Sequence, residues 1–347
     1  MTDNNAPQQK IVRRVPRTPN NQYGVVDATT IPIDKPCIIA IGGERTVSRK
    51  DANFYASLLN QLLGYYNIDD VAIYSAYYPS DKTNRSAERN QIFRNAQTRI
   101  KRHNNATPLS ENEHICDLYQ QIIKPRIISK NNERFSNAEA IHNLHRVMIF
   151  THCHGAAVVR VFMDMMRSDM EKYKYDKQII PQIMQQLLVV QHAPTAPLHN
   201  SLFNTISFMS ATDTLMDFHN QFSTYVSEHG EDMVPSYFSA GNFFAAYTFT
   251  KNMVDEHQII GLVPGQPQDQ LSPDGAIIMA AERNAIINGV KSIKTTNADV
   301  LSAQQLIAPV SPNDTIKPDF RELQHNGDVF MSVMQRDLKR FHSQTTR

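Results

Sequence analysis

The amino-acid sequence predicts an α/β fold, with a mostly parallel central sheet, flanking helices and one polar insertion. Short apolar runs rich in β-branched residues alternate with segments whose apolar residues recur at helical spacing. The runs 36–41 and 71–74 enclose such a helical segment at 49–63, which implies parallel strands joined by a crossover. Polar residues follow the strands directly, where open parallel sheets bind their ligands.

The same alternation continues towards the end of the chain. Strands are expected at 147–150, 187–190 and 205–209, a β-prone segment at 243–249, and helices at 111–127, 137–144, 155–170, 277–287 and 328–341. No internal repeat interrupts this pattern. We therefore expect the chain to form one hydrophobic core with insertions.

We expect a single domain over 22–347, preceded by a flexible basic tail over 1–21. The tail is rich in Pro and Asn and lacks apolar periodicity. Its basic residues are Lys10, Arg13, Arg14 and Arg17. Residues 79–110 are polar with little periodicity, which predicts an insertion or lid.

The charge balance argues against nucleic acid as a partner. The chain carries 35 basic and 34 acidic residues, so no net field draws it to a polyanion. No run approaches the roughly 18 apolar residues of a membrane-spanning helix, so an integral membrane protein is not expected. A protein partner stays open.

Cysteine usage and the start of the chain favour a cytoplasmic location. The three cysteines make an odd number without paired spacing, which argues against a disulfide framework. The first residues lack the charged and apolar regions of a signal peptide. Export by a route that uses no cleavable signal stays open.

Cys153 stands where an apolar strand meets a helix. The strand Val147–Phe150 precedes it, and the small residues Gly155 and Ala156 let the next helix pack closely. A nucleophile on a strained turn needs this combination. Cys37, inside a strand, and Cys116, on a helix, are expected to be ordinary core residues, because free cysteine is often buried.

The segment Thr151-His152-Cys153-His154-Gly155 resembles the nucleophile elbow of the α/β-hydrolase superfamily. In that superfamily a Ser, Cys or Asp follows the fifth strand in a small-x-nucleophile-x-small pattern, and threonine here replaces the usual first glycine. In element order the resemblance spans roughly residues 36–215. It implies that Cys153 is the nucleophile.

The resemblance also implies an oxyanion hole. The backbone N–H of His154 would be one donor, at the start of a helix. The second would come from Gly43 or Glu44, in the tight turn after the first apolar strand. Both amides would bind the oxyanion of a tetrahedral intermediate.

By the same resemblance, the acid and base of a triad come later in the chain. Asp213, at the tip of the strand 205–209, is the expected acid, with Asp217 as the fallback. His325, just before the last helix, is the expected base, and His257 is the alternative. The base would take the thiol proton, and the acid would orient the imidazole.

Other histidines lie close to these residues in the sequence. His152 and His154 flank Cys153, but no further Cys/His pair stands at ligand spacing, so we expect no metal. His192 and His199, after the next strand, are expected to face water rather than the site.

These residues predict a thiol-dependent hydrolase or acyltransferase without a cofactor. It would attack an ester, thioester or amide carbonyl of a small-molecule or acylated substrate and form an acyl-enzyme on Cys153. The alternative is a non-catalytic binding protein, or a secreted bacterial effector, on an α/β-hydrolase scaffold.

Overall fold

A computed structural model gives the structure of the chain. It describes residues 11–20, 22–43, 46–78, 113–194, 201–210, 243–246, 259, 261–264, 270–311 and 317.

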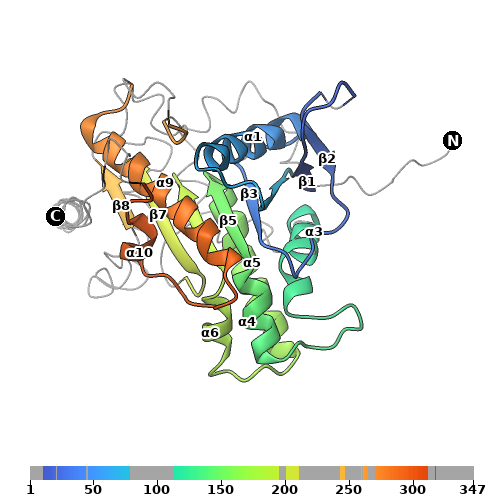
Figure 1. Cartoon of the computed structure of the whole chain (residues 1–347). Helices are drawn as coiled ribbons and strands as arrows, with labels where there is room; N and C mark the ends of the chain where they lie inside the picture. Colours follow the sequence, from blue (N-terminus) through green and yellow to red (C-terminus); the bar gives the residue numbers. More distant parts are fainter. Residues whose placement is uncertain are drawn as a thin grey trace, which may run out of the picture.

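The described strands form one eight-stranded sheet in the order β2-β1-β4-β3-β5-β6-β7-β8 (Figure 1). The strands are β1 (Ile11–Arg14), β2 (Val25–Asp27), β3 (Cys37–Ile41), β4 (Ala72–Ala76), β5 (Val147–His152), β6 (Leu188–His192), β7 (Asn204–Ser210) and β8 (Phe243–Ala246). Strands β3 to β8 run parallel, whereas β1 is antiparallel to both β2 and β4. The predicted α/β class with a mostly parallel sheet is confirmed.

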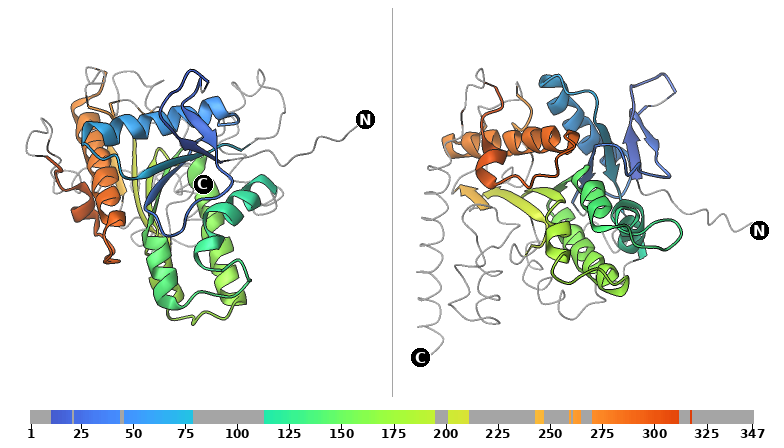
Figure 2. Two further views of the ribbon diagram at one scale, coloured as in Figure 1. Left: turned by 45° about the vertical axis from the view of Figure 1, so that its right-hand side comes forward. Right: turned by 60° about the horizontal axis from the view of Figure 1, so that its bottom comes forward.

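Helices cover both faces of the sheet, as the right-hand view of Figure 2 shows. One face carries α1 (Arg49–Tyr65), α9 (Pro273–Lys294) and α10 (Ala303–Ile307). The other carries α3 (Glu113–Ile122), α4 (Asn137–His145), α5 (Gly155–Lys172) and α6 (Ile180–Met184). Strands β3 and β5 are buried on both faces, which explains their nearly continuous apolar sequence.

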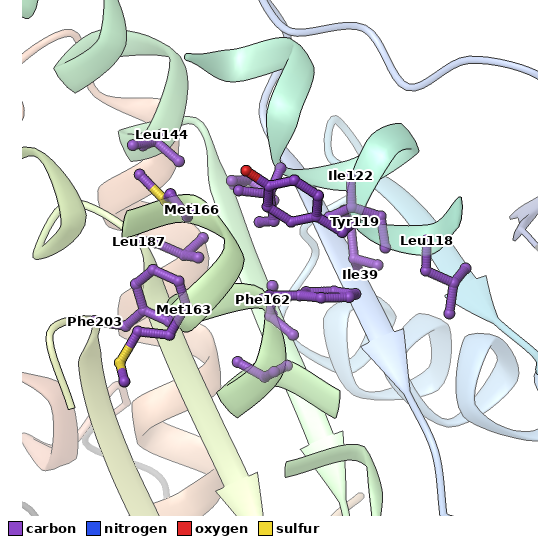
Figure 3. Packing of buried hydrophobic residues seen from close by; sticks show 14 of the residues in the cluster. Ile39, Leu118, Tyr119, Ile122, Leu144, Phe162, Met163, Met166, Leu187 and Phe203 are labelled. Carbon is purple, nitrogen blue, oxygen red and sulfur yellow. The ribbon is translucent and has the colours of Figure 1, made fainter. Parts of the chain in front are cut away.

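Figure 3 shows the buried side chains that pack between the sheet and the helices α3 and α5. Tyr119 of α3 and Phe162 of α5 are fully buried, with ring centroids 6.1 Å apart. The Tyr119 hydroxyl donates to the Asp169 carboxylate of α5 at 2.8 Å, so this polar atom is satisfied at the edge of an apolar cluster.

Most predicted elements overlap their observed counterparts, although the helix expected at 277–287 is the longer α9, Pro273–Lys294. The expected helix at 111–127 ends at Ile122 and is followed by a 3₁₀ helix, Lys124–Arg126, because Pro125 has no N–H to continue an α-helix. The insertion at 79–110 and the helix at 328–341 lie outside the described residues.

The predicted flexible tail is wrong for Ile11–Arg14. These residues form β1, which pairs with β4 and β2, and the side chains of Ile11 and Val12 are buried. Two apolar residues are too few to show a period, so the strand is recognised only from its pairing with β2 and with the distant β4. Among the described helices, none has the length and apolar character needed to cross a bilayer.

His145, the last residue of α4, and Arg146, which follows it, bind the carboxyl end of α9. The Arg146 guanidinium donates to the carbonyls of Ile293, Lys294 and Thr295, and the His145 Nε2 lies 3.0 Å from the Ser292 carbonyl oxygen. These groups satisfy carbonyls that have no partner within the helix. Burial lowers the pKa of His145 from its usual value, although the hydrogen bond to Ser292 opposes this shift.

His145 should therefore make the fold sensitive to mild acid. Because its pKa is lower in the folded chain, the unfolded chain takes up this proton first, and stability falls as the pH drops from about 6.5 towards the folded value. Urea unfolding at several pH values measures the loss. His145→Gln keeps an N–H donor for Ser292 but cannot titrate, so it should lose less stability over this range. Equal losses in the two proteins would contradict the assignment.

Candidate functional site

Cys153 lies on a sharp turn between β5 and α5, as expected from the strand and helix patterns around it. Its φ is +53°, in the left-handed region that residues other than glycine seldom occupy. Its N–H donates to the His192 carbonyl oxygen of β6 at 3.1 Å, and its own carbonyl accepts from Ala156 of α5 at 3.1 Å. Left-handed backbone costs about 1–2 kcal/mol, so the surrounding contacts must hold this conformation.

Gly155 lets the first turn of α5 approach the carboxyl end of β3. A Cβ at this position would lie 2.0 Å from the Ile41 carbonyl oxygen and 3.0 Å from that of Gly42. Both obstacles are backbone atoms, which cannot rotate away. Any side chain at this position would therefore push the cysteine turn away from β3.

The turn after β3 lies directly beside the thiol. A Cβ at Gly43 would lie 3.1 Å from the Cys153 Cβ and 3.5 Å from its Sγ. A Cβ at Gly42 would overlap the side chains of Thr46 and Tyr55, at 2.2 Å from each. Gly43 thus lets bare backbone lie against Cys153, and Gly42 leaves room for the side chains of Thr46 and Tyr55.

His152 is held by a tyrosine of α1. Its Nδ1 lies 2.7 Å from the Tyr55 hydroxyl, which also accepts a long hydrogen bond of 3.4 Å from the Gly43 N–H. Burial raises the pKa of Tyr55 to about 12, and the hydrogen bond from Gly43 opposes the shift. The phenol is therefore neutral near physiological pH and keeps a proton to donate.

His154 is held by a different tyrosine, which follows β4. The Tyr78 hydroxyl donates to the Gly42 carbonyl oxygen at 2.8 Å, and its oxygen lies 3.2 Å from the His154 Nδ1. The Tyr78 N–H in turn donates to the Thr46 carbonyl at 3.0 Å. The turn after β3 therefore hydrogen-bonds both Tyr55 and Tyr78, the two tyrosines that contact the histidines on either side of Cys153.

A third histidine near the turn forms a buried pair. The His192 Nδ1 lies 2.8 Å from the Glu282 carboxylate of α9, and both side chains are almost completely buried, at 1% and 0% exposure. The expectation that His192 faces water is wrong, because α9 covers the end of β6 and brings a carboxylate to it. The ring centroids of His192 and His152 lie 5.5 Å apart.

One feature of the sequence marks this pair, although it belongs to no motif. Glu282 interrupts the apolar run 277–287, which the structure buries almost entirely within α9. A carboxylate in such a run is rarely buried without a partner. The partner, however, lies 90 residues away along the chain.

Only part of the expected site falls within the described residues. His154 and Gly43 lie beside Cys153, and the Gly43 amide donates to Tyr55 rather than pointing to an open position. The other expected or alternative residues, Glu44, His199, Asp213, Asp217, His257 and His325, lie outside the described residues. Among those described, no hydrogen bond joins an imidazole to the Cys153 Sγ.

The other two cysteines have different surroundings. Cys37 is buried in β3, and its Sγ lies 3.6 Å from a guanidinium nitrogen of the buried Arg126. Burial raises the pKa of Cys37, and Arg126 only partly opposes this. Cys116 is partly exposed on α3, where burial likewise raises its pKa. All three cysteines are free thiols.

Within the part of the chain that the structure describes, no three His, Cys, Asp or Glu residues come together as a metal site. The Nδ1 atoms of His152 and His154 already contact tyrosine hydroxyls.

No model of a known protein family matches the chain, and no curated protein matches it either. The local geometry therefore carries the functional argument.

Replacing Gly155 should test the close contact between α5 and β3. We expect Gly155→Ala to lower the free energy of unfolding by about 1–3 kcal/mol, because the new Cβ would overlap the Ile41 carbonyl. Urea denaturation gives this value. Gly64→Ala is the matched control: a Cβ there meets nothing within 4 Å, and the change should stabilise α1 by about 0.4–1 kcal/mol. Similar effects of the two substitutions would contradict the close approach.

Proposed function

We propose that this chain is a thiol-dependent hydrolase or acyltransferase with an α/β-hydrolase architecture, and that Cys153 is its nucleophile. The observation that carries the proposal is the positive φ of Cys153, at a turn packed against backbone through Gly155. Strain of this kind persists where the surrounding structure over-determines it, and it is common at active sites. A buried structural cysteine needs no such conformation.

The position of the turn in the sheet supports the same proposal. Cys153 follows β5, the fifth of the described strands in chain order, and the nucleophile of the α/β-hydrolase superfamily also follows the fifth strand. The next strand, β6, accepts its N–H, and the turn after β3 lies beside its thiol. Backbone amides at the start of α5 favour a developing negative charge.

In the proposed reaction the Cys153 thiolate attacks the carbonyl carbon of an ester, thioester or amide. A C–S bond forms, the carbonyl oxygen becomes an oxyanion, and the bond to the leaving group then breaks to give a thioester on the enzyme. Water or another acceptor attacks this thioester and restores the thiol. The resemblance assigns the thiol proton to His325, or alternatively His257, with Asp213 as the orienting acid.

The oxyanion would be held by the His154 amide and by Gly43 or Glu44. For Gly43 to donate, its N–H must exchange the Tyr55 hydroxyl for the oxyanion. The present bond is 3.4 Å long, at the weak end of the range, so the exchange loses little hydrogen-bond energy.

Because its cysteines are free, we further propose that the protein works in a reducing compartment, the cytoplasm.

One observation favours the second candidate, a non-catalytic binding protein. The three described histidines around the turn have their Nδ1 atoms on Tyr55, Tyr78 and Glu282, and none of them bonds to the Cys153 Sγ. A binding protein would keep the turn as a structural feature and would not need a reactive thiol.

Alkylation of the three cysteines separates the two candidates. With iodoacetamide near neutral pH, we expect Cys153 to react at least about tenfold faster than Cys116, which is also partly exposed, while buried Cys37 reacts slowest. Peptide mass spectrometry reports each rate. Cys153→Ala should remove the fast phase and leave the urea midpoint nearly unchanged. Slow labelling at all three positions would favour the binding protein.

A further inference from the structure

The two neighbouring strands at the cysteine turn end in the same way. β5 ends with His152 and β6 with His192, and these two residues are paired in the register of the sheet. The residue after each of them has a left-handed backbone, with a φ of +53° at Cys153 and of +43° at Ala193. Neither residue is a glycine, so contacts with the surrounding structure must hold both conformations.

The peptide group between His192 and Ala193 joins the cysteine turn to the sheet. Its carbonyl oxygen accepts the Cys153 N–H at 3.1 Å, and its N–H donates to the Phe208 carbonyl oxygen of β7 at 2.8 Å. The orientation of this one peptide group therefore decides where the Cys153 amide finds its acceptor. If the group rotates, the left-handed turn loses one of the bonds that hold it.

The side chain of His192 is held from outside the sheet. Its Nδ1 lies 2.8 Å from a carboxylate oxygen of Glu282, on α9, and neither side chain is more than 1% exposed. The other oxygen of this carboxylate, Oε1, has no hydrogen-bond partner among the described residues. Glu282 thus bonds to the end of β6 through His192, at a place where bulk water does not replace a lost bond.

We infer that Glu282 is a positioning residue for Cys153, which acts through the His192 side chain on the peptide group that accepts the Cys153 N–H. Its effect on acyl transfer rests on the proposed function, because it requires Cys153 to be the nucleophile. Its effect on the conformation of the turn does not. Misplacing a reacting group by about 1 Å can cost about a hundredfold in rate, so a residue in α9 can control the reaction without touching a substrate.

Amide hydrogen exchange of the ¹⁵N-labelled full chain, followed by NMR, tests the conformational effect without requiring activity. The rate at the Cys153 amide is compared with the rates in β3, which lies between two strands and reports opening of the whole sheet. Glu282→Ala should raise this ratio by about tenfold, because it removes the bond that fixes His192. Glu282→Gln should leave the ratio nearly unchanged, because its side-chain amide can still bond to the imidazole Nδ1 as donor or acceptor.

Asn284→Ala is the matched control on the same helix. The Asn284 side chain is buried and donates to the Ile307 carbonyl oxygen of α10 rather than bonding to β6. Its loss should lower the urea midpoint, because a buried carbonyl loses its donor. The exchange ratio at Cys153 should stay as it is in the unaltered chain.

A double variant keeps the test decisive if Glu282→Ala fails to fold. His192→Leu/Glu282→Leu replaces the whole buried pair by apolar residues, a change that often preserves or raises stability. The apolar side chains pack without a directed bond, so the peptide group after His192 is no longer fixed. The exchange ratio at Cys153 should rise as it does in Glu282→Ala.

The alkylation rate of Cys153, measured against that of Cys116 in the same variants, separates this inference from the proposed function. A fast thiol that Glu282→Ala slows by about tenfold or more, while Glu282→Gln and Asn284→Ala do not, supports both. A thiol that is slow in the unaltered chain, together with the expected rise in exchange, overturns the proposed function and leaves the inference standing. An exchange ratio that neither Glu282→Ala nor the double variant raises above that of Asn284→Ala overturns the inference, whatever the thiol does.

Discussion

The arrangement around Cys153 depends on the backbone contact between the first turn of α5 and the carboxyl end of β3. The parallel register of β3 and β5 pairs Ile41 with Thr151, so the chain must turn immediately beyond this pair. Gly155 allows the turn to lie on the Ile41 carbonyl, and the Cys153 amide is bound by β6. Because each of these contacts comes from a different strand, the left-handed conformation of Cys153 is a property of the whole sheet.

Polar groups surround this turn inside an otherwise apolar layer. The helix α1 supplies Tyr55 and α9 supplies Glu282, and each holds a histidine at the end of a neighbouring strand. Burying an ionisable pair such as His192–Glu282 costs desolvation that its mutual attraction does not always recover. The presence of the pair is therefore weak evidence for net stability. Here it fixes the end of β6, whose carbonyl holds Cys153.

The fold was predictable where the local pattern was decisive. Strands buried on both faces, such as β3 and β5, are continuous apolar runs, and α5 shows clear helical spacing after Gly155. β1 was not predictable, because two buried residues show no period and the strand joins the sheet by pairing with β4, more than 60 residues away. Local sequence therefore predicts the layers better than the edge of the sheet.

The site was predictable only along one segment. The position of Cys153 on a turn follows from the small residues beside it. In the sequence, however, Tyr55 looks like an ordinary core residue of an amphipathic helix, and Tyr78 like an apolar residue just after a strand. Their role depends on a hydroxyl that meets a partner from another element, which no periodicity reports. At Thr151 the sequence departs from the glycine that is usual two residues before the nucleophile. The turn forms nevertheless, and the Thr151 side chain is fully buried beside it.

Acyl transfer to the protein is the most direct test of Cys153 as a nucleophile. After brief exposure of the chain to an activated aryl ester, peptide mass spectrometry can locate any acyl group that has been retained. We expect one acyl group, bound as a thioester to Cys153, that disappears on incubation in water or on addition of an acyl acceptor. Acylation confined to surface lysines, or none in the peptide that contains Cys153, would contradict it.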